Sequence, residues 1–168
     1  MFTIYNATSS DGYIARLDGS EDFIPDNVWP YFLHLCNEHG SLVMGRKSYD
    51  SVQKYDKKLI ESLEELPIRL VVVTKNRKDF IPRKRYVVAH SPEDAYAFAP
   101  GALVSSGPGL NNELIKKRMI GTIIIRELPI TIDEGIKPFD IDTASLILNK
   151  KYFGPENTII KKYSVKYF

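Results

Sequence analysis

Apolar residues occur along the chain in short runs that polar and glycine-rich stretches separate. The runs IRLVVVT (68–74) and GTIIIR (121–126) are almost continuously apolar, which is typical of parallel strands covered on both faces. The first seven residues alternate and are rich in β-formers, so they predict another strand. Further strands are predicted at 41–44, 85–89, 103–104, 145–149 and 158–168. The last two are expected to pair as an antiparallel hairpin across residues 152–157.

Helices are predicted between these strands. Ser91-Pro92 followed by two acids is a strong helix start, with a capping hydroxyl, a proline in the first turn and nearby negative charge. Asp26 is predicted to cap a helix that runs to about His39, with Pro30 tolerated in its first turn. Two more helices are predicted at 46–54 and 110–118. This alternation indicates one α/β domain over residues 1–168, with a mixed, mainly parallel sheet and helices on both faces.

Composition narrows the functional classes. The 168 residues carry a net charge of only +2, which argues against nucleic-acid binding; short basic runs such as 83–85 are the one feature in its favour. Cys36 is the only cysteine and the three histidines lack metal-like spacing, so neither a disulfide nor a metal site is expected. No apolar run approaches the roughly 18 residues of a membrane span, and the N-terminus lacks a signal-peptide pattern. No membrane association is expected, and the cytoplasm is the expected location.

Three turns that follow predicted strands are rich in small and polar residues. They are Gly45-Arg46-Lys47-Ser48, Thr74-Lys75-Asn76-Arg77 and the stretch SSGPGL (105–110), which leads into a helix. In open α/β sheets, ligands bind where strands end and helices begin, and glycine, free N–H groups and cations there favour phosphates. The third turn is neither a Walker loop nor a GxGxxG fingerprint. Together the turns predict a dinucleotide site, while each alone also fits an ordinary tight turn.

Five motifs, in order along nearly the whole chain, give the sequence a family resemblance. The segment SSDGYIA (9–15) resembles the S-x-D-G-x-I-A segment of the dihydrofolate reductase-like superfamily, and MGRKSY (44–49) resembles its M-G-R-x-T-W/Y turn. SGPGL (106–110), PITIDEGIKPF (129–139) and YSV (163–165) resemble three later family motifs. The likeness is greatest to the reductase domain of the bifunctional riboflavin-biosynthesis deaminase–reductase and its free-standing relatives. The resemblance implies the three-layer αβα sandwich of this superfamily.

The resemblance also implies an NADPH-dependent reductase that delivers hydride to a pyrimidine- or pteridine-type substrate. Ala7 and Ile14 would line the nicotinamide site. The pyrophosphate and adenosine ribose would be held by Gly45, Arg46, Lys47 and Ser48. Thr74 and Lys75 would lie near the 2′-phosphate, where extra cations suit NADP better than NAD. The other side of the pyrophosphate would be wrapped by Ser106, Gly107, Pro108, Gly109 and Leu110.

Two positions depart from the family pattern. Ser106-Gly107 replaces a pair of glycines, which leaves open whether the cis peptide common at that turn is kept. A second glycine-rich segment is reduced to Asp133-Glu134-Gly135, and its acids would repel a phosphate, so this loop is expected to face elsewhere. Both departures are compatible with weakened cofactor binding.

The catalytic acid is less well defined by the sequence. Dihydrofolate reductases use a helix-borne carboxylate, and the corresponding region here contains Asp26 and Asn27, of which Asn27 occupies the aligned position. An asparagine forms hydrogen bonds but carries no charge. Asp26 as a helix cap is an equally good interpretation. Asp11 is a third candidate, with a structural role in its Ser-Asp-Gly turn as the alternative.

The uncertain carboxylate favours the riboflavin-pathway branch, in which a ribosylamino-pyrimidine phosphate is reduced, as in 5-amino-6-(5-phosphoribosylamino)uracil reductases. Arg16 and Lys137 are candidate cations for that phosphate. Trp29, Tyr31 and Phe32 are candidates to stack on a heterocycle, although their spacing also fits a helix core. Dihydrofolate reduction and a nucleotide-binding homologue without catalysis remain as alternatives. A homodimer through an apolar edge near the terminal hairpin is also compatible with the resemblance.

Overall fold

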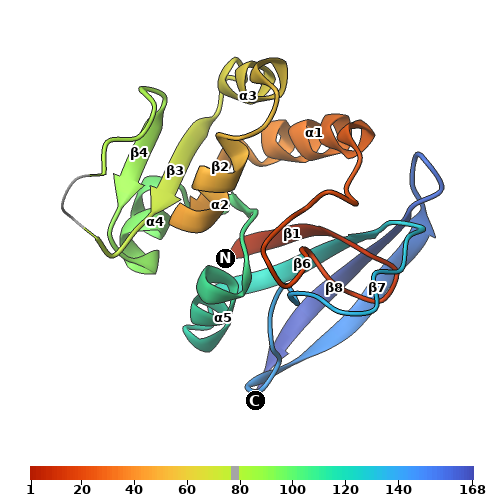
Figure 1. Cartoon of the computed structure of the whole chain (residues 1–168). Coiled ribbons are helices and arrows are strands. Elements are labelled where there is room, and N and C mark those ends of the chain that lie inside the picture. Colours follow the sequence, from red (N-terminus) through yellow and green to blue (C-terminus); the bar gives the residue numbers. More distant parts are fainter. Residues whose placement is uncertain (77–79) are drawn as a thin grey trace.

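The structure is a computed structural model that describes residues 1–76 and 80–168, so Arg77 lies outside the described residues. The described residues form an eight-stranded sheet in the order β4-β3-β2-β5-β1-β6-β8-β7 (Figure 1). Its strands are β1 (Phe2–Thr8), β2 (Ser41–Gly45), β3 (Arg69–Val73), β4 (Tyr86–Ala89), β5 (Leu103–Val104), β6 (Ile120–Glu127), β7 (Ala144–Phe153) and β8 (Ile159–Tyr167).

The strands from β4 to β6 in this order run parallel, whereas β8 is antiparallel to both β6 and β7. The predicted mixed, mainly parallel sheet with a terminal antiparallel hairpin is therefore confirmed. β7 continues to Phe153, so Tyr152 and Phe153 belong to the strand rather than to the connecting turn. Pairing across the hairpin extends this far because Tyr152 and Phe153 lie opposite Ile160 and Ile159.

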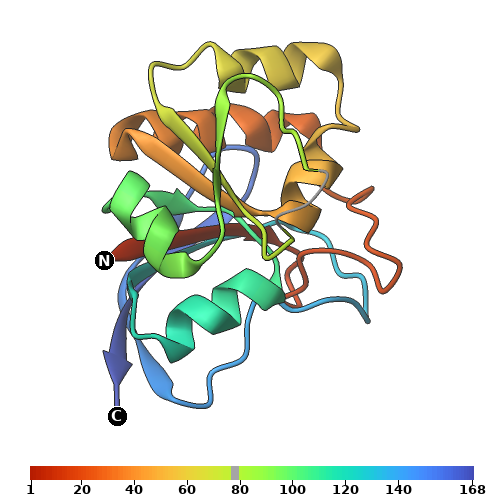
Figure 2. The same ribbon diagram turned by 90° about the vertical axis from the view of Figure 1, so that its left-hand side faces the viewer.

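Helices cover both faces of the parallel part of the sheet (Figure 2). On one face, α1 (Trp29–His39) and α3 (Lys57–Glu64) pack with the short α2 (Arg46–Val52), and their buried members include Leu35, Leu63 and Tyr49. On the other face, α4 (Pro92–Phe98) and α5 (Pro108–Lys116) pack through residues such as Ala95 and Leu114. Because both faces are covered, the central strands are apolar on both sides, which explains the continuous run at 69–73.

The starts of two helices differ in how well the sequence predicts them. Ser91 caps α4 as expected, since its side chain accepts a hydrogen bond from Asp94 N at 3.0 Å and Pro92 is the first helical residue. The prediction that Asp26 caps the first helix is wrong. Asp26 begins a 3-10 turn (Asp26–Val28) and makes no side-chain cap bond, and α1 starts only at Trp29. A short 3-10 turn before Pro30 keeps the proline within the first turn of α1, where its missing N–H has no cost.

Helix α3 was not expected from the sequence, although its signals are present. The Asp56 side chain accepts a hydrogen bond from Lys58 N at 2.8 Å and so caps the helix. Ile60 and Leu63 then form its buried face at a helical spacing of three. The cap and the amphipathic pattern are both present in the sequence, so this helix was predictable.

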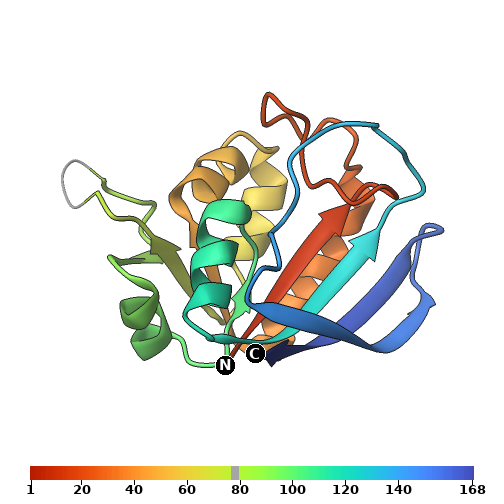
Figure 3. The same ribbon diagram turned by 90° about the horizontal axis from the view of Figure 1, so that it is seen from below.

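The carboxyl ends of β1, β2, β3 and β5 lie at one edge of the sheet. Figure 3 shows the long loop after β1, in red, beside the loop that follows β6, in light blue, at this edge. The two loops are joined by an isolated bridge in which Ile14 N donates to Ile136 O at 2.8 Å and Ile136 N donates to Ala15 O at 2.8 Å. Of the helices in the described part of the chain, none is long and apolar enough to cross a membrane.

Candidate active site

A cavity of about 660 Å³ opens at this edge of the sheet. Its wall includes every cofactor-site residue that the sequence suggested: Ala7, Ile14, Gly45, Arg46, Lys47, Ser48, Thr74, Lys75, Ser106, Gly107, Pro108, Gly109 and Leu110. These residues come from the ends of four strands and from the loop after β1. The fold thus brings together turns that are far apart in the sequence, and their role in cofactor binding stays a prediction.

Ser106 joins two of these turns. Its hydroxyl accepts a hydrogen bond from Gly45 N at 3.1 Å and lies 3.4 Å from the hydroxyl of Ser48. A Cβ added at Gly45 would lie only 2.9 Å from the same hydroxyl, so the two turns approach as closely as a glycine permits. The serine that replaces a family glycine therefore contributes to the contact between the turns.

A buried amide network fixes the backbone of the same turn. Asn111 Nδ2 lies 3.0 Å from Ser106 O, 2.9 Å from Pro138 O and 3.2 Å from Asn6 Oδ1, and Asn6 Nδ2 donates to Ser106 O at 2.9 Å. The Ser106–Gly107 peptide is trans, which answers the question left open by the sequence. In a trans peptide the N–H points opposite to the C=O. With Ser106 O directed into the network, Gly107 N–H is directed away from it, at a residue that lines the cavity.

Helix α5 starts immediately after this peptide. No side chain caps its N-terminus, and Gly107 is the N-cap residue. Backbone N–H groups of the first turn have no intrahelical partners, and they carry the positive end of the helix dipole. Gly109 and Leu110 in this turn both line the cavity. The turn is therefore suited to an anion such as a pyrophosphate.

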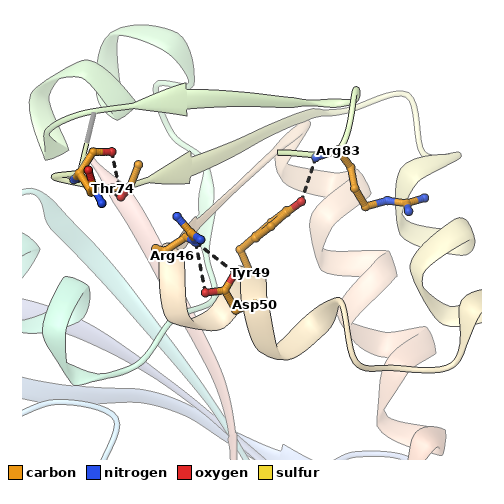
Figure 4. Close-up of polar contacts among 6 residues, drawn as sticks. Arg46, Tyr49, Asp50, Thr74 and Arg83 are labelled. Atoms are coloured by element: carbon orange, nitrogen blue, oxygen red, sulfur yellow. Dashed lines mark hydrogen bonds and ion pairs between the residues drawn. The ribbon is translucent and has the colours of Figure 1, made fainter. Parts of the chain in front are cut away.

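The cations of the cavity lie on the same side. Arg46 Nε lies 3.1 Å from each carboxylate oxygen of Asp50 (Figure 4). The Arg46 guanidinium also lies 3.9 Å from the centroid of the Phe80 ring. Lys75 Nζ lies 3.5 Å from a carboxylate oxygen of Glu113 on α5. The backbone after Thr74 forms a turn in which Asn76 N donates to Thr74 Oγ1 at 3.3 Å. We call this cation-bearing half, from Gly45 to Ser48, Thr74 to Lys75 and Ser106 to Leu110, the phosphate half.

The opposite end of the cavity has a different character. It is lined mainly by apolar and aromatic side chains of α1 and the preceding loop, among them Ile24, Val28, Trp29 and Phe32. The rings of Trp29 and Phe32 lie 5.0 Å apart, and Trp29 is held by a hydrogen bond from its Nε1 to Ser62 Oγ at 2.9 Å. We call this end, completed by Glu21 and Tyr55, the aromatic chamber.

Glu21 is the carboxylate of the aromatic chamber. Tyr55 donates a short hydrogen bond to Glu21 Oε2, and both residues line the cavity. Burial raises the pKa of Glu21, and the hydrogen bond from Tyr55 opposes this shift. Burial, together with the charge of Glu21, also raises the pKa of Tyr55 well above its ordinary value. A carboxyl that keeps its proton to higher pH beside a ligand chamber is a candidate general acid.

The raised pKa of Glu21 has a consequence for stability. Because the folded protein holds this proton more tightly than the unfolded chain, ionisation of Glu21 costs folding stability. The cost is absent below the unfolded pKa and complete above the folded one. Glu21→Gln is therefore expected to raise Tm at about pH 8 and to leave it unchanged at about pH 4, as measured by thermal unfolding. An equal shift of Tm at both pH values would contradict this account of Glu21.

The three acid candidates from the sequence do not line the cavity. Asp26 and Asn27 are exposed in the 3-10 turn that precedes α1. The Asp11 carboxylate accepts hydrogen bonds from Asp133 N at 2.8 Å and Ile132 N at 3.3 Å. Hydrogen bonding, first from Ser9 and then from these backbone groups, lowers the pKa of Asp11. Asp11 thus joins the loop after β1 to the loop after β6. Its role is structural, as the alternative from the sequence suggested, but it connects two loops instead of acting only within its own turn.

The acidic segment 133–135 lies against the loop after β1, and Ile136 beyond it lines the cavity. A Cβ added at Gly135 would lie 2.4 Å from Ala15 O and 3.0 Å from Tyr13 Cβ. Because a backbone carbonyl cannot move aside without breaking the bridge to Ile136, Gly135→Ala is expected to cost about 1–3 kcal/mol of stability. Urea unfolding measures this. Gly109→Ala, which meets no atom within 4 Å, is the matched control and is expected to cost nothing.

Arg126 stabilises the backbone of the aromatic chamber through a hydrogen bond to Val28 O. It is fully buried and donates to Thr158 Oγ1 at 3.0 Å, Val28 O at 3.2 Å and Pro155 O at 3.2 Å. Tyr5, which lines the cavity, is influenced by Arg126. Burial raises the pKa of Tyr5 to about 12, although the positive charge of Arg126 acts in the opposite direction. The bond to Val28 O fixes the approach of the chain to α1.

Sequence reasoning missed Glu21, Tyr55, Asn111 and Arg126. Glu21 and Tyr55 lie in irregular segments 34 residues apart, and no periodic pattern relates them. Arg126 ends the apolar run GTIIIR, where a charged residue is a signal that could have marked it. Asn111 stands beside the polar Asn112 and Glu113, so nothing in the sequence distinguishes it.

Comparisons with known proteins agree on the fold. No family model and no curated protein sequence matches the chain. Among solved structures, a protein from Shewanella sp. PV-4 assigned to riboflavin biosynthesis superimposes with a TM-score of 0.75 at 23% identity, covering 98% of each chain. Dihydrofolate reductase from Enterococcus faecalis, complexed with NADP(H) and RAB-propyl, gives a TM-score of 0.70 at 18% identity, covering 98% of this chain and 96% of that one.

A bifunctional enzyme from Thermotoga maritima adds a third comparison. This diaminohydroxyphosphoribosylaminopyrimidine deaminase/5-amino-6-(5-phosphoribosylamino)uracil reductase gives a TM-score of 0.68 at 13% identity. The match covers 98% of this chain and 56% of the larger enzyme. Together with the sheet order and the helices on both faces, these likenesses identify the fold of the chain as dihydrofolate reductase-like.

Proposed function

We propose that this protein is an NADPH-dependent reductase that transfers hydride to a substrate containing a pyrimidine- or pteridine-type heterocycle. The observation that carries the proposal is the division of one cavity into a phosphate half and an aromatic chamber that contains a carboxyl group. The phosphate half has the cations and N–H groups that bind the phosphates of a dinucleotide. The aromatic chamber has the aromatic side chains on which a heterocycle can stack. Ala7 and Ile14 also line this cavity and are the residues proposed to contact the nicotinamide.

The residues of the phosphate half fit the cofactor. Gly107 N–H and the uncapped first turn of α5 would hold the pyrophosphate, while Arg46, Lys47 and Lys75 supply positive charge for the 2′-phosphate that distinguishes NADP from NAD. The Enterococcus faecalis reductase of the same fold is complexed with NADP(H), which supports this choice. When bound, the cofactor supplies hydride.

The chain itself has to orient the heterocycle and manage a proton. Trp29 and Phe32 provide aromatic faces on which a planar ring can stack, and the apolar wall limits access of water. Tyr55 holds Glu21 Oε2, so Oε1, which has no hydrogen-bond partner among the described residues, is left to face a ligand. Glu21 is the group proposed to hold the proton that the substrate takes up together with the hydride.

Two substrates follow from the proteins that share the fold. One is the ribosylamino-pyrimidine phosphate of the riboflavin pathway, on which the Thermotoga maritima enzyme is named to act, and the other is dihydrofolate. Loss of NADPH absorbance with either compound tests the proposal. If the protein binds NADPH but reduces neither compound, the proposal is wrong for these two substrates.

The proposed acid can be tested against the acid suggested by the sequence. Removal of a general acid typically lowers the rate by about 10²–10⁴-fold. Glu21→Gln is therefore expected to lower kcat by about 100-fold or more, whereas Asp26→Asn, outside the cavity wall, is expected to leave kcat unchanged. The opposite result would move the catalytic role to the 3-10 turn.

A nucleotide-binding homologue without catalysis is the second candidate. One observation favours it: Gly45 N–H, a donor that a phosphate would use, already binds the Ser106 hydroxyl. An increase of Tm by NADPH without turnover on any heterocycle would support this candidate instead of the reductase.

A further inference from the structure

The cations in the wall of the cavity are confined to the phosphate half. Among the described residues that line the cavity they are Arg46, Lys47 and Lys75, which lie on the turns after β2 and β3. If the cofactor occupies this half, its own phosphates use these charges. A phosphate on the substrate would therefore need other cations.

The described residues of the aromatic chamber include no cation that lines the cavity. Its charged lining residue is Glu21, and the rest of its wall is apolar or aromatic. Of the two cations suggested by the sequence, Arg16 pairs with Asp22, with 2.5 Å between Nε and Oδ1, and neither Arg16 nor Lys137 lines the cavity. Arg126 is nearby but is fully buried, with its donors directed to Val28 O, Pro155 O and Thr158. Arg126 does not line the cavity, and each of its three nitrogen atoms already donates a hydrogen bond within the protein.

A phosphate dianion in this chamber would meet a carboxylate instead of cations. Two like charges that lie close together repel each other more strongly at a partly buried site than in water. Sites that bind phosphate monoesters offset this cost with arginine, lysine or several N–H donors. The described part of the chamber has no such set, and the uncapped turn of α5 belongs to the phosphate half.

An N–H donor is the partner that Glu21 lacks. Tyr55 occupies Oε2, and no described residue donates to Oε1. A carboxylate forms its strongest hydrogen bonds with planar nitrogen groups that present N–H donors along an edge. A heterocycle stacked near Trp29 and Phe32 could present such an edge to Glu21.

We propose that the heterocycle bound in the aromatic chamber carries no phosphate and presents N–H donors to Glu21. This inference rests on the proposed function, because it assigns the phosphate half to the cofactor. The substrate class is then an unphosphorylated, neutral or cationic nitrogen heterocycle. The phosphorylated compound of the riboflavin pathway is a poor fit to this chain.

A matched pair of ligands tests the inference: 5-amino-6-(ribosylamino)uracil with and without its 5′-phosphate. The full-length protein is first saturated with NADP⁺, which binds without supplying hydride, and calorimetry verifies this step. Trp29 is the only tryptophan and lies in the chamber wall, so its fluorescence reports binding of either compound. At about pH 8, the unphosphorylated compound is expected to bind at least tenfold more tightly, which corresponds to about 1.4 kcal/mol.

Two variants test whether Glu21 causes the preference for the unphosphorylated compound. Glu21→Gln is expected to weaken the unphosphorylated compound, to strengthen the phosphorylated one, and so to abolish the tenfold preference. Glu61→Gln removes the same charge from α3, outside the cavity wall, and is expected to keep the preference of the wild-type protein.

The outcomes separate the inference from the proposed function. Tighter binding of the phosphorylated compound, equal binding of the two, or failure of both to bind the NADP⁺-loaded protein would overturn the inference and leave cofactor binding intact. A preference that survives Glu21→Gln would overturn it as well. Absence of NADP⁺ binding in the first step would refute the proposed function itself.

Discussion

Replacement of Asn111 by aspartate is expected to destabilise the protein by about 3–5 kcal/mol, a large share of the roughly 5–15 kcal/mol that stabilises a typical domain. Asn111 is fully buried, and its Nδ2 serves Ser106 O, Pro138 O and Asn6 Oδ1. An aspartate would direct a carboxylate at three oxygen atoms, with no cation to compensate it in the described surroundings. Urea unfolding at neutral pH measures the loss.

The pH dependence of the same variant tests whether the lost stability is due to the buried charge. Protonation of the new carboxyl restores a donor, so part of the lost stability of Asn111→Asp is expected to return as the pH is lowered to about 5. Asn149→Asp, an exposed asparagine on β7, is the matched control and is expected to change stability by less than about 0.5 kcal/mol. Equal, small effects of the two substitutions would show that the amide network does not hold the turn.

Ser106→Val is expected to weaken NADPH binding by about 10–100-fold with a smaller effect on folding. Valine removes a hydroxyl that could donate to a phosphate oxygen, and its two methyl groups would also keep that oxygen from Gly45 N–H, because the turns already approach closely there. A hydrogen bond to a charged group is worth about 1.5–3 kcal/mol, and every 1.4 kcal/mol is a factor of ten in affinity. Calorimetric titration of the variant with NADPH measures the change, and thermal unfolding verifies that the variant is folded.

Ser106→Gly is the companion variant. It removes the hydroxyl without adding volume and frees Gly45 N–H for a phosphate oxygen, so NADPH binding within a few-fold of wild type is expected. If Ser106→Val also binds NADPH as the wild type does, the pyrophosphate does not lie between the turns at Gly45 and Ser106.

The sequence predicted the parallel sheet and the phosphate half because both are encoded locally. A buried parallel strand has an apolar run such as 69–73, and a turn that approaches a ligand has small residues such as those at 105–110. The topology of an α/β sheet then brings the carboxyl ends of the strands together, so the sequence alone predicts that three separate turns share one cavity.

The carboxyl group in the cavity wall could not be predicted in the same way. The family resemblance points to Asp26 or Asn27, at the start of the first predicted helix. The carboxyl in the cavity wall instead belongs to Glu21, in an irregular loop whose path is fixed by contacts such as the hydrogen bond from Tyr55. Such tertiary contacts leave no periodic signal. Helix α3, in contrast, has local signals in the sequence, a capping aspartate at position 56 and apolar residues at helical spacing, and was predictable from them.

Calorimetric titration of the unmodified protein with NADPH and, in parallel, with NADH tests the central claim most directly. The account predicts one NADPH bound per chain, with an affinity at least about tenfold higher than for NADH, because Arg46, Lys47 and Lys75 give the 2′-phosphate at least one charge-assisted contact. Failure to bind either nicotinamide nucleotide would contradict the account, since the phosphate half of the cavity would then have a different ligand.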